Sequence, residues 1–397
     1  MAGIKYFPQD SNIEDKNIIL RLDLNVPLKD KKIQDFSRIT SVLPFLRDLI
    51  KKKSKIIIIA HLGRPKGRKD NKYSLLPIYK YLKLKLENNI YFYTGEINDD
   101  VKNKISYLKQ GDVLLIENIR FFKEETYNEE SFSKKLGDLA DIYINDAFSC
   151  CHRKQASIHM ITKFIKKSYA GPLVEKEINA INSIIEKRKK PVTCIIGGSK
   201  ISTKIGVVLN LIKNVDNIIV VGAMANNFLT HKNIEVGKSL VEDNTKDIID
   251  KILIESKKYG CKIIIPKDCL VSKNYDGTAS VKTINDIARN EMILDIGPQT
   301  IEDIKRTIDQ SNTIMWNGPA GYFENKEFAL GTNSIAEKIS NNTAKNSLIS
   351  VLGGGDTLSA INKVNIKLNF THLSTAGGAF LEYLEGKELP GLTVLKN

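Results

Sequence analysis

Short apolar runs rich in β-branched residues alternate with longer amphipathic stretches along most of this 397-residue sequence. The runs lie at 17–22, 55–59, 89–93, 112–116 and 141–145, then at 191–196, 217–221, 261–266, 312–316 and 346–352. Helix-like patterns lie between them, among them 75–86, 203–212 and 245–258. Near-continuous apolar strands alternating with amphipathic helices are typical of βαβ units, in which helices cover both faces of a parallel sheet. The alternation therefore predicts an α/β fold.

One amphipathic stretch, 175–188, separates the two sets of runs. It places Ile178, Ile181 and Ile185 on one stripe, and a basic run followed by Pro191 ends it. A chain of this length exceeds one ordinary domain. We expect two doubly wound, Rossmann-like parallel-sheet domains joined by a helix hinge. The expected bounds are 1–172 for the N-terminal domain, 173–190 for the interdomain helix and 191–377 for the C-terminal domain.

Composition narrows the class of protein. The chain is 42% hydrophobic and 27% charged, and its five cysteines lack metal-site spacing. These values are typical of a soluble globular protein in a reducing cytoplasm. The start, MAGIKYFPQD, has no apolar signal segment, and no apolar run approaches the length of a membrane span. We expect a cytoplasmic protein with no membrane partner.

The formal net charge of +14 raises the alternative of a nucleic-acid-binding protein. Lysines are scattered along the chain, however, which favours a compositional bias spread over a solvated surface. Arginines are concentrated instead: seven of the ten lie within the first 153 residues. Their planar forks suit phosphate or carboxylate. We therefore expect no nucleic-acid partner and a small anionic ligand in the first half.

Anion-binding side chains follow the predicted strands of the first half. Asp23 and Asn25 lie on the same side of a strand end, where each suits a substrate hydroxyl. Gly63 shapes the turn after the next strand. Ligands bind beyond the carboxyl ends of parallel strands, and a parallel sheet gathers these cationic residues there: Arg38, His61, Arg64, Arg120 and Arg153. Singly, each is more often a surface ion-pair partner. Together they exceed what one aspartate neutralises and predict a small substrate with a phosphate and a carboxylate.

Glycine-rich turns follow the predicted strands of the second half. VLGGGDTLSAIN leads from a strand through three glycines into a helix, and its turn comprises Gly354, Gly355, Asp356 and Thr357. Such a turn brings backbone N–H groups and the positive end of a helix close to a phosphate. Asp356 adds a carboxylate suited to a phosphate-bound Mg²⁺. A plain turn with Asp356 as the N-cap is an equally good interpretation of the pattern alone.

A second glycine turn carries two lysines. GGSKISTK places Lys200 and Lys204 four residues apart, which predicts one face of a starting helix and two phosphate ligands. The spacing of a Walker A loop is absent. Glu324, shortly after WNGP at 316–319, suits ribose hydroxyls, and a solvated surface glutamate is the alternative interpretation. No catalytic triad order, zinc spacing or obvious general base occurs. A carboxylate acceptor needs no base, so the pattern favours phosphoryl transfer by positioning and charge neutralisation.

Motifs along nearly the whole chain resemble one known family. They are RLDLNVP, FSRIT, AHLGRP, ENIRF, CHRKQAS, GGSKISTKIG, ILDIGP, WNGPAGYFE, GGGDTLSAI and STAGGAFLEYLEGKELPG. In this order they are similar to the phosphoglycerate kinase family, although any one of them alone is weak. The resemblance implies reversible phosphoryl transfer between MgATP and the carboxylate of 3-phosphoglycerate, giving ADP and 1,3-bisphosphoglycerate. It places that reaction in glycolysis and gluconeogenesis.

The resemblance also implies a role for each candidate residue. In the N-terminal domain, Asp23 and Asn25 hold the substrate hydroxyl, and Arg38 meets the reacting carboxylate. The substrate phosphate is held by His61, Gly63, Arg64, Arg120 and Arg153. In the C-terminal domain, Asp356 holds the metal. The other residues that face the nucleotide are Lys200, Lys204, Asn317, Pro319, Glu324, Gly354, Gly355 and Thr357. Closure of the domains then completes a catalytic clamp of Arg38, Lys200 and Gly355 for direct in-line transfer.

The resemblance further implies a hinge-bending monomer whose C-terminal segment, 378–397, packs back on the first domain. The sequence departs from the family pattern at two places. Val221 and Ala223 stand where many relatives have glycine, and so does Ala376. These changes bear on the shape of the adenine pocket and on closure. A non-catalytic binder that has kept both pockets is the competing hypothesis, which activity alone separates, and a charge-driven nucleic-acid-binding protein is the other.

Overall fold

The computed structural model describes residues 3–364 and 366–396. The chain divides into two compact units, of which the first comprises the residues up to Ile178 and those from Glu388 onward. The second comprises Asn179–Lys387. Helix α6, Pro172–Ile185, crosses the first division. The sequence-based boundary placed the return to the first domain at 378, whereas the chain re-enters the first unit at Glu388.

A six-stranded parallel sheet forms the first unit, in the order β5-β6-β4-β1-β7-β8. Its strands are β1 (Asn17–Leu22), β4 (Lys55–Ala60), β5 (Ile90–Tyr93), β6 (Val113–Ile116), β7 (Ile142–Asp146) and β8 (Lys167–Ala170). The chain leaves β1 towards β4 and leaves the neighbouring β7 towards β8, in opposite directions. Such a switch point is where open α/β sheets bind ligands.

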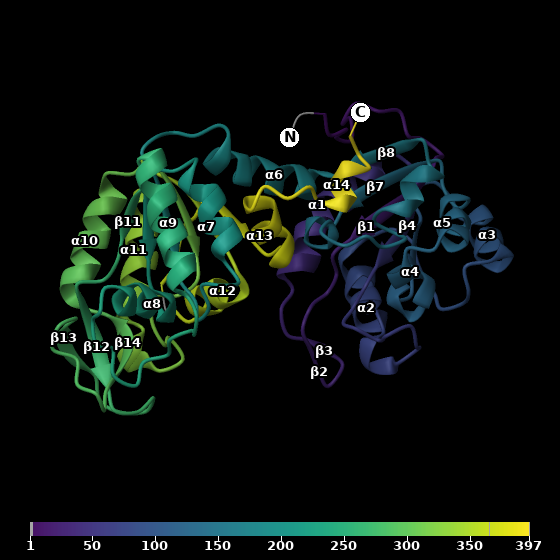
Figure 1. Cartoon of the computed structure of the whole chain (residues 1–397). Coiled ribbons are helices and arrows are strands. Elements are labelled where there is room, and N and C mark those ends of the chain that lie inside the picture. The colour runs from purple at the N-terminus through teal and green to yellow at the C-terminus, as the bar shows by residue number, and fades with distance from the viewer. Residues whose placement is uncertain (1–2, 365, 397) are drawn as a thin grey trace. The chain divides into compact units, whose positions relative to one another are not determined.

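Helices of the first unit pack on this sheet because their apolar residues recur at helical spacing. Helix α1 buries Ile39, Val42 and Leu46 against β1 and β4, which contribute Ile18 and Ile56 to the same core. Figure 1 shows these elements. The helices of this unit are α1 (Ser37–Lys51), α2 (Leu76–Lys85), α3 (Asp99–Ser106), α4 (Lys123–Tyr127), α5 (Glu130–Gly137) and α14 (Pro390–Thr393).

The second unit repeats the plan with a six-stranded parallel sheet ordered β11-β10-β9-β15-β16-β17. Its strands are β9 (Val192–Ile196), β10 (Asn217–Val220), β11 (Lys262–Ile264), β15 (Thr313–Asn317), β16 (Ile349–Gly353) and β17 (His372–Ser374). The switch point lies between β9, which leads to β10, and β15, which leads to β16. The expected fold class, two doubly wound parallel sheets, is thereby confirmed.

Helices of the second unit cover this sheet in the same manner. Ile304 and Ile308 of α10 and Ile335 of α11 pack with Trp316 of β15 in one buried core. The helices are α7 (Ile205–Ile212), α8 (Ala223–His231), α9 (Lys246–Tyr259), α10 (Pro298–Asp309), α11 (Leu330–Ala344), α12 (Gly355–Ile361) and α13 (Gly378–Leu384). No helix in residues 3–364 and 366–396 combines the length and apolar content needed to cross a membrane.

Several short strands were not anticipated from the sequence. They include β8 and β17 at the sheet edges, which carry only a few apolar residues. An antiparallel sheet, β13-β12-β14, comprises β12 (Asp268–Ser272), β13 (Ser280–Thr283) and β14 (Met292–Ile296). A hairpin of β2 (Leu28–Lys29) and β3 (Lys32–Ile33) follows β1. These strands are too short for a period-2 pattern to distinguish them from loops.

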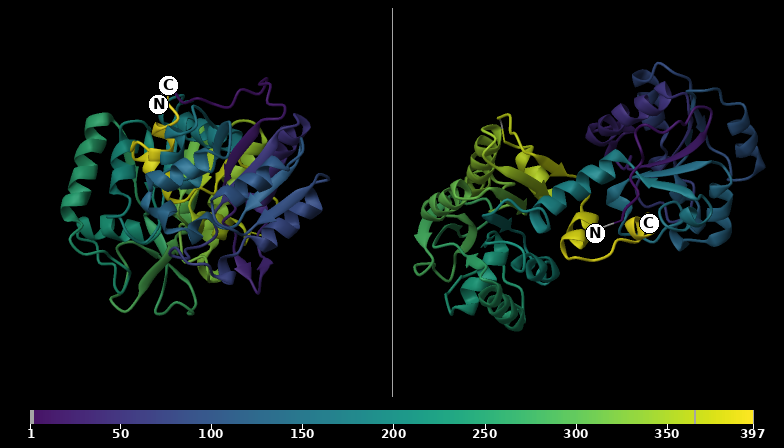
Figure 2. Two further views of the ribbon diagram at one scale, coloured as in Figure 1. Left: turned by 90° about the vertical axis from the view of Figure 1, so that its right-hand side faces the viewer. Right: turned by 90° about the horizontal axis from the view of Figure 1, so that it is seen from above.

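The two ends of the described chain lie side by side in the first unit (Figure 2). The Lys5 amide donates a hydrogen bond to the Leu395 carbonyl at 2.8 Å. The Gly391 amide, in α14, donates to the Cys151 carbonyl at 2.9 Å. Helix α13 precedes this segment and belongs to the second unit, where the Asn210 side chain of α7 donates to the Leu384 carbonyl at 2.7 Å. The last residues therefore complete the first unit.

Candidate functional site

Polar groups at the end of β1 are tied to α1 and to the turn after β4. The Arg38 guanidinium forms an ion pair with Asp23, with Nη1 and Oδ2 2.8 Å apart, and donates to the Asn25 carbonyl at 3.0 Å. The Asn25 side-chain oxygen accepts from the Gly63 amide at 2.8 Å. The Ser149 hydroxyl donates to the same oxygen of Asp23. The structure thus brings Asp23, Asn25, Arg38 and Gly63 together at the switch point.

Gly63 occupies a position that only glycine fits. Its φ is +61°, and a Cβ there would lie 2.3 Å from the Tyr73 ring. Its carbonyl accepts from Nη1 of Arg120 at 2.9 Å, while its amide holds Asn25. The side-chain amide of Asn118 stabilises the same turn by donating to the Leu62 carbonyl at 2.7 Å. The turn after β4 is therefore held rigidly beside Arg120.

Arg120 lies in the short 3₁₀ helix after β6 and is only 6% exposed. Burial lowers the pKa of its guanidinium to about 10, and the neighbouring Arg153 adds to that effect. It has no carboxylate within ion-pair distance in the part of the chain that the structure describes; its second side-chain contact is the Gln155 amide oxygen at 3.4 Å. A buried cation in this state is stabilised by an anionic ligand.

His61 is buried beneath the same cluster. Burial lowers the pKa of its imidazole well below the usual value, and Arg21, Arg120, Arg153 and Arg38 lower it further, in that order. The ring is therefore neutral at physiological pH. Nη2 of Arg21 lies 3.3 Å from its Nδ1. Because a guanidinium only donates, Nδ1 accepts and the ring proton lies on Nε2, which leaves Nε2 as a hydrogen-bond donor.

A buried network behind His61 escaped the sequence-based interpretation. Nε of Arg21 donates to the Ser157 hydroxyl at 2.9 Å, and that hydroxyl donates to Glu125 at 2.7 Å. Arg21 and Glu125 are both fully buried. Burial raises the pKa of Glu125. The available signal was a charged residue inside the apolar run 17–22, which is unusual in a buried strand. Through His61, the network orients the site.

The two remaining arginines of the cluster, Arg64 and Arg153, are more exposed to solvent than Arg120. Nε of Arg153 is 3.1 Å from Nε2 of His152, and the side chain is partly exposed. Arg153 lies near enough to Arg120 and His61 to lower the pKa of both. Arg64 is exposed, and among residues 3–364 and 366–396 it forms no side-chain hydrogen bond or ion pair. The structure therefore gathers the cluster except for Arg64, whose side chain has no contact that fixes its direction.

Two glycine turns meet at the switch point of the second unit. A Cβ on Gly197 would lie 2.3 Å from the Pro319 carbonyl oxygen, and a Cβ on Gly318 would lie 2.3 Å from the Gly197 carbonyl oxygen. Gly318 has a φ of +100°. The backbones after β9 and β15 therefore touch, which no other residue type permits. Gly222, at the start of α8, packs against the same turns: a Cβ on Gly222 would lie 3.0 Å from the Pro319 carbonyl oxygen.

Side chains of Asn317, Lys204 and Thr357 fasten these turns together. The Asn317 amide donates to the Gly353 carbonyl at 2.7 Å, and the Thr357 hydroxyl accepts from the Gly318 amide at 2.7 Å. Lys204 donates to the Asn317 side-chain oxygen at 2.7 Å and to the Gly197 carbonyl. Burial lowers the pKa of Lys204 to about 8.

The expectation that Lys200 and Lys204 share one face of a starting helix was wrong. Helix α7 begins at Ile205, with Lys204 as its N-cap, and residues 201–204 form turns. Lys200 is exposed, whereas Lys204 is half-buried and turned towards Asn317. The two glycines before them let the chain turn more than once before the helix starts, which the four-residue spacing could not reveal.

Helix α12 starts at the third turn, after Gly354. A Cβ on Gly354, whose φ is +104°, would lie 2.6 Å from the Asn317 amide nitrogen, whereas a Cβ on Gly355 would meet nothing within 4 Å. Gly354 is therefore needed for packing, and Gly355 leaves its backbone open to an incoming group. Asp356 follows and is exposed. The helix start presents unpaired backbone N–H groups.

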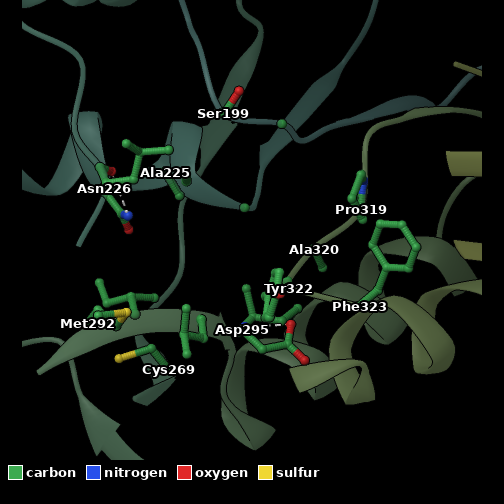
Figure 3. Close-up of a pocket in the computed structure, with 18 of the residues that line it drawn as sticks. Ser199, Ala225, Asn226, Cys269, Met292, Asp295, Pro319, Ala320, Tyr322 and Phe323 are labelled. Atoms are coloured by element: carbon green, nitrogen blue, oxygen red, sulfur yellow. Dashed lines mark hydrogen bonds between the residues drawn. The ribbon is translucent and has the colours of Figure 1, made fainter. Parts of the chain in front are cut away.

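A cavity of about 480 Å³ opens beside these turns. Figure 3 shows its walls, with Pro319 and Phe323 on one side and Asn226, Met292 and Cys269 on the other. Its other lining residues include Gly198, Ser199, Gly222, Ala223, Leu229, Leu294, Asp295, Tyr322, Glu324 and Asp356. An apolar cavity with a few polar groups at its rim suits a base and a sugar. The structure places Glu324 and Asp356, both exposed, on its lining.

Of the departures from the family pattern, Ala223 lines the cavity and Val221 lies in the core.

The side chains that could bind a metal ion are few at this site. Within residues 3–364 and 366–396, no three histidine, cysteine, aspartate or glutamate side chains form a group suited to a metal ion. Asp356 is a single exposed carboxylate beside the glycine turn. Mg²⁺ commonly binds through one or two carboxylates together with substrate phosphates and water, so one carboxylate at this position fits that ion.

Known proteins similar to this chain share one description. A sequence model of the family "Phosphoglycerate kinase" matches residues 9–387. A relative described as phosphoglycerate kinase from Wolbachia pipientis wMel is 42% identical over 390 residues, or 98% of each chain. Another, from Chelativorans sp., is 39% identical over 398 residues and the full length of both. Among solved structures, phosphoglycerate kinase from Coxiella burnetii superposes with a TM-score of 0.90 at 36% identity, covering 97% of each chain.

Proposed function

Since the chain belongs to the phosphoglycerate kinase family, which comprises glycolytic phosphotransferases with a carboxyl group as acceptor, we propose that it transfers a phosphoryl group directly and in line between MgATP and the carboxylate of 3-phosphoglycerate. The products are ADP and 1,3-bisphosphoglycerate, and the reaction runs in both directions. The chain acts as a cytoplasmic monomer, with no membrane or nucleic-acid partner. Closure of its two domains brings the substrates together.

The observation that carries this proposal is the buried Arg120 of the first unit, which lies among other cations without a carboxylate at ion-pair distance in the described chain. Burial, followed by neighbouring positive charges, lowers the pKa of His61, so this ring is neutral beside the cations. The phosphate of 3-phosphoglycerate supplies the missing negative charge. It accepts from Arg120, Arg153, Arg64 and from Nε2 of His61. Asp23 and Asn25 position the substrate hydroxyl.

The nucleotide occupies the cavity of the second unit in this proposal. Its base fills the apolar part, and Glu324 accepts from the ribose hydroxyls. Lys200, Lys204 and the amides at the start of α12 hold its phosphates, with Asn317 and Pro319 alongside. Asp356 would hold a Mg²⁺ ion, which supplies charge neutralisation between the phosphates when bound.

The transfer step needs charge stabilisation more than proton transfer. The acceptor carboxylate is already ionised, so no general base is required. Arg38 neutralises that carboxylate, and Lys200 and the Gly355 amide stabilise the charge on the migrating phosphoryl group. Closure excludes water and completes this clamp. The Arg38 side chain is held by Asp23 and Asn25, so it is positioned before the substrate arrives.

The test is formation of an acyl phosphate from MgATP and 3-phosphoglycerate, trapped with hydroxylamine. We expect product from the wild type and a fall in kcat of about a hundredfold for Arg38→Ala. Arg47→Ala is the matched control, since Arg47 lies on the same helix α1, is exposed and donates a side-chain hydrogen bond to the Lys85 carbonyl. Its kcat should match that of the wild type. An Arg38→Ala variant with wild-type kcat would refute the assignment of Arg38.

The same assay distinguishes the proposed enzyme from a non-catalytic protein that has kept both binding sites. Such a protein binds 3-phosphoglycerate and ADP in calorimetry but gives no hydroxamate product. Binding of neither ligand by a folded chain would remove the basis of the proposal altogether.

A further inference from the structure

Asn226 lies on α8 in the wall of the nucleotide cavity and is 1% exposed. Its Nδ2 donates to the Leu240 carbonyl at 3.0 Å. Its Oδ1 is buried and has no hydrogen-bond partner in residues 3–364 and 366–396. Buried polar atoms are nearly always paired in folded proteins, so an unpaired one on a cavity wall calls for a ligand.

The orientation of this amide is fixed by its partner. A backbone carbonyl only accepts, so the nitrogen of Asn226 must face Leu240 and the oxygen must face the other way. An exchange of the two atoms would set two oxygens against each other. Asn226 therefore keeps its unpaired oxygen, Oδ1, as an acceptor for a ligand in the cavity.

The neighbouring groups do not satisfy that acceptor. Figure 3 shows Met292 and Cys269 on the same side of the cavity, and Pro319 and Phe323 across from it. Asp295 also lines the cavity, but its two oxygens already accept from the Ile296 amide at 2.8 Å and the Gly331 amide at 2.7 Å. Asn226 thus differs from Asp295 in holding an oxygen that nothing engages.

We propose that Asn226 selects the nucleotide base, with Oδ1 accepting a hydrogen bond from the exocyclic 6-amino group of adenine. This inference rests on the proposed function, which puts the ribose beside Glu324 and the phosphates at the glycine turns, and so leaves the far wall of the cavity for the base. A 6-oxo purine places an oxygen against the Asn226 oxygen. The site therefore favours adenine over hypoxanthine, since two buried acceptors in contact remain unpaired.

The experiment compares MgADP with MgIDP, which differ at position 6 of the base and at the adjoining ring nitrogen. Calorimetric binding to the wild type should be at least about tenfold tighter for MgADP. Asn226→Leu keeps the approximate volume and removes the acceptor, so the preference should fall to less than about twofold. Met292→Leu is the control, because it alters the same wall without changing hydrogen bonding, and it should keep the wild-type preference.

A second measurement needs no variant. The diphosphate of purine riboside lacks any substituent at position 6, and it should bind the wild type at least about tenfold more weakly than ADP. Equal affinities of the wild type for ADP, IDP and the purine analogue would overturn the role of Asn226 while leaving the proposed function standing. A preference retained by Asn226→Leu would do the same. Failure of the folded wild type to bind any of the three would instead count against the proposed function.

Discussion

The two units carry the same parallel-sheet plan but build their sites from different materials. The first unit uses side chains, because Arg38, Arg120 and His61 reach a switch point from separate elements. The second uses backbone, because Gly197 and Gly318 touch there and leave room for no side chain. Side-chain charge suits a small anion that must be neutralised, whereas bare backbone suits a longer ligand that must lie close to the chain. In the proposed function, one architecture thus serves two kinds of recognition.

The largest effect is expected from removing a side chain of the first unit. Arg120→Met should weaken binding of 3-phosphoglycerate about a hundredfold, because it removes a buried charge-assisted hydrogen bond to the phosphate. Calorimetry measures this, and MgADP affinity should stay unchanged. Arg68→Met is the control for net charge, since Arg68 is exposed in the loop after β4, where the neighbouring Gly67 amide donates to the Arg120 carbonyl. Equal losses for the two variants would mean that overall charge, not the placed side chain, binds the substrate.

The second-largest effect is expected from adding one methyl group to a glycine turn of the second unit. Gly318→Ala forces a Cβ against the Gly197 carbonyl and should lower the free energy of unfolding by about 2 kcal/mol and weaken MgADP binding. Gly260→Ala is the matched control, with a positive φ of +68° but nothing within 4 Å of the added atom. Chemical denaturation compares them. If both variants lose the same stability, backbone conformation alone explains the glycine, and close approach of the turns does not.

A side chain of the second unit should matter less than those of the first. Lys204→Met should weaken MgADP binding about tenfold, while Lys213→Met, at the other end of α7, should not. The pKa of Lys204 is about 8 in the folded chain, so its charge is lost as pH rises through about 8. Affinity for MgADP should therefore fall above that pH in the wild type and stay level in Lys204→Met. A hundredfold loss of MgADP affinity in Lys204→Met would mean that the second unit depends on side-chain charge as strongly as the first.

The last prediction concerns a feature that both units share. Burial raises the pKa of Asp146 and of Asp295 to about 7. Each folded-state pKa lies above the unfolded value, so the folded chain holds protons that the unfolded chain has released. The free energy of unfolding should therefore fall as pH rises from about 4 to about 7, by about 1 kcal/mol per pH unit for each residue just below pH 7.

Asp146→Asn and Asp295→Asn should each remove one part of that slope. The two carboxylates have similar partners, since Asp146 accepts from the Leu173 amide at the start of α6 and Asp295 from the Gly331 amide at the start of α11. Denaturation at pH 5, 6 and 7 measures the slopes. Unchanged slopes in both variants would mean that other groups set the pH dependence.

Most of the fold could be predicted from the sequence. The run 17–22 coincides with β1, and 55–59 lies within β4, because buried parallel strands need an uninterrupted apolar stretch. The three residues of β17 and the antiparallel sheet of β12, β13 and β14 were missed. Those strands depend on pairing with distant partners, which local composition does not encode.

The sequence identified most candidate site residues, but it did not identify the residues that position them. Cations after strands are visible in a sequence, so Arg38, His61 and Arg120 were identified as a group. Arg21 was not assigned, because a buried charge takes its role from partners such as Ser157, which lies far away along the chain. The orientation of Lys204 depends on how a glycine turn folds, and the unpaired oxygen of Asn226 depends on where Leu240 lies. Such facts exist only in three dimensions.

The backbone contact between Lys5 and Leu395 has a consequence for synthesis of the chain. During translation, every residue of the second unit is synthesised before the residues from Glu388 onward. The first unit therefore begins to form earliest and is completed last. Its closing segment packs at Gly391 against Cys151, directly after the strand turn that carries Ser149. A chain that ends before those final residues would contain all of the second unit but would lack the segment that completes the first.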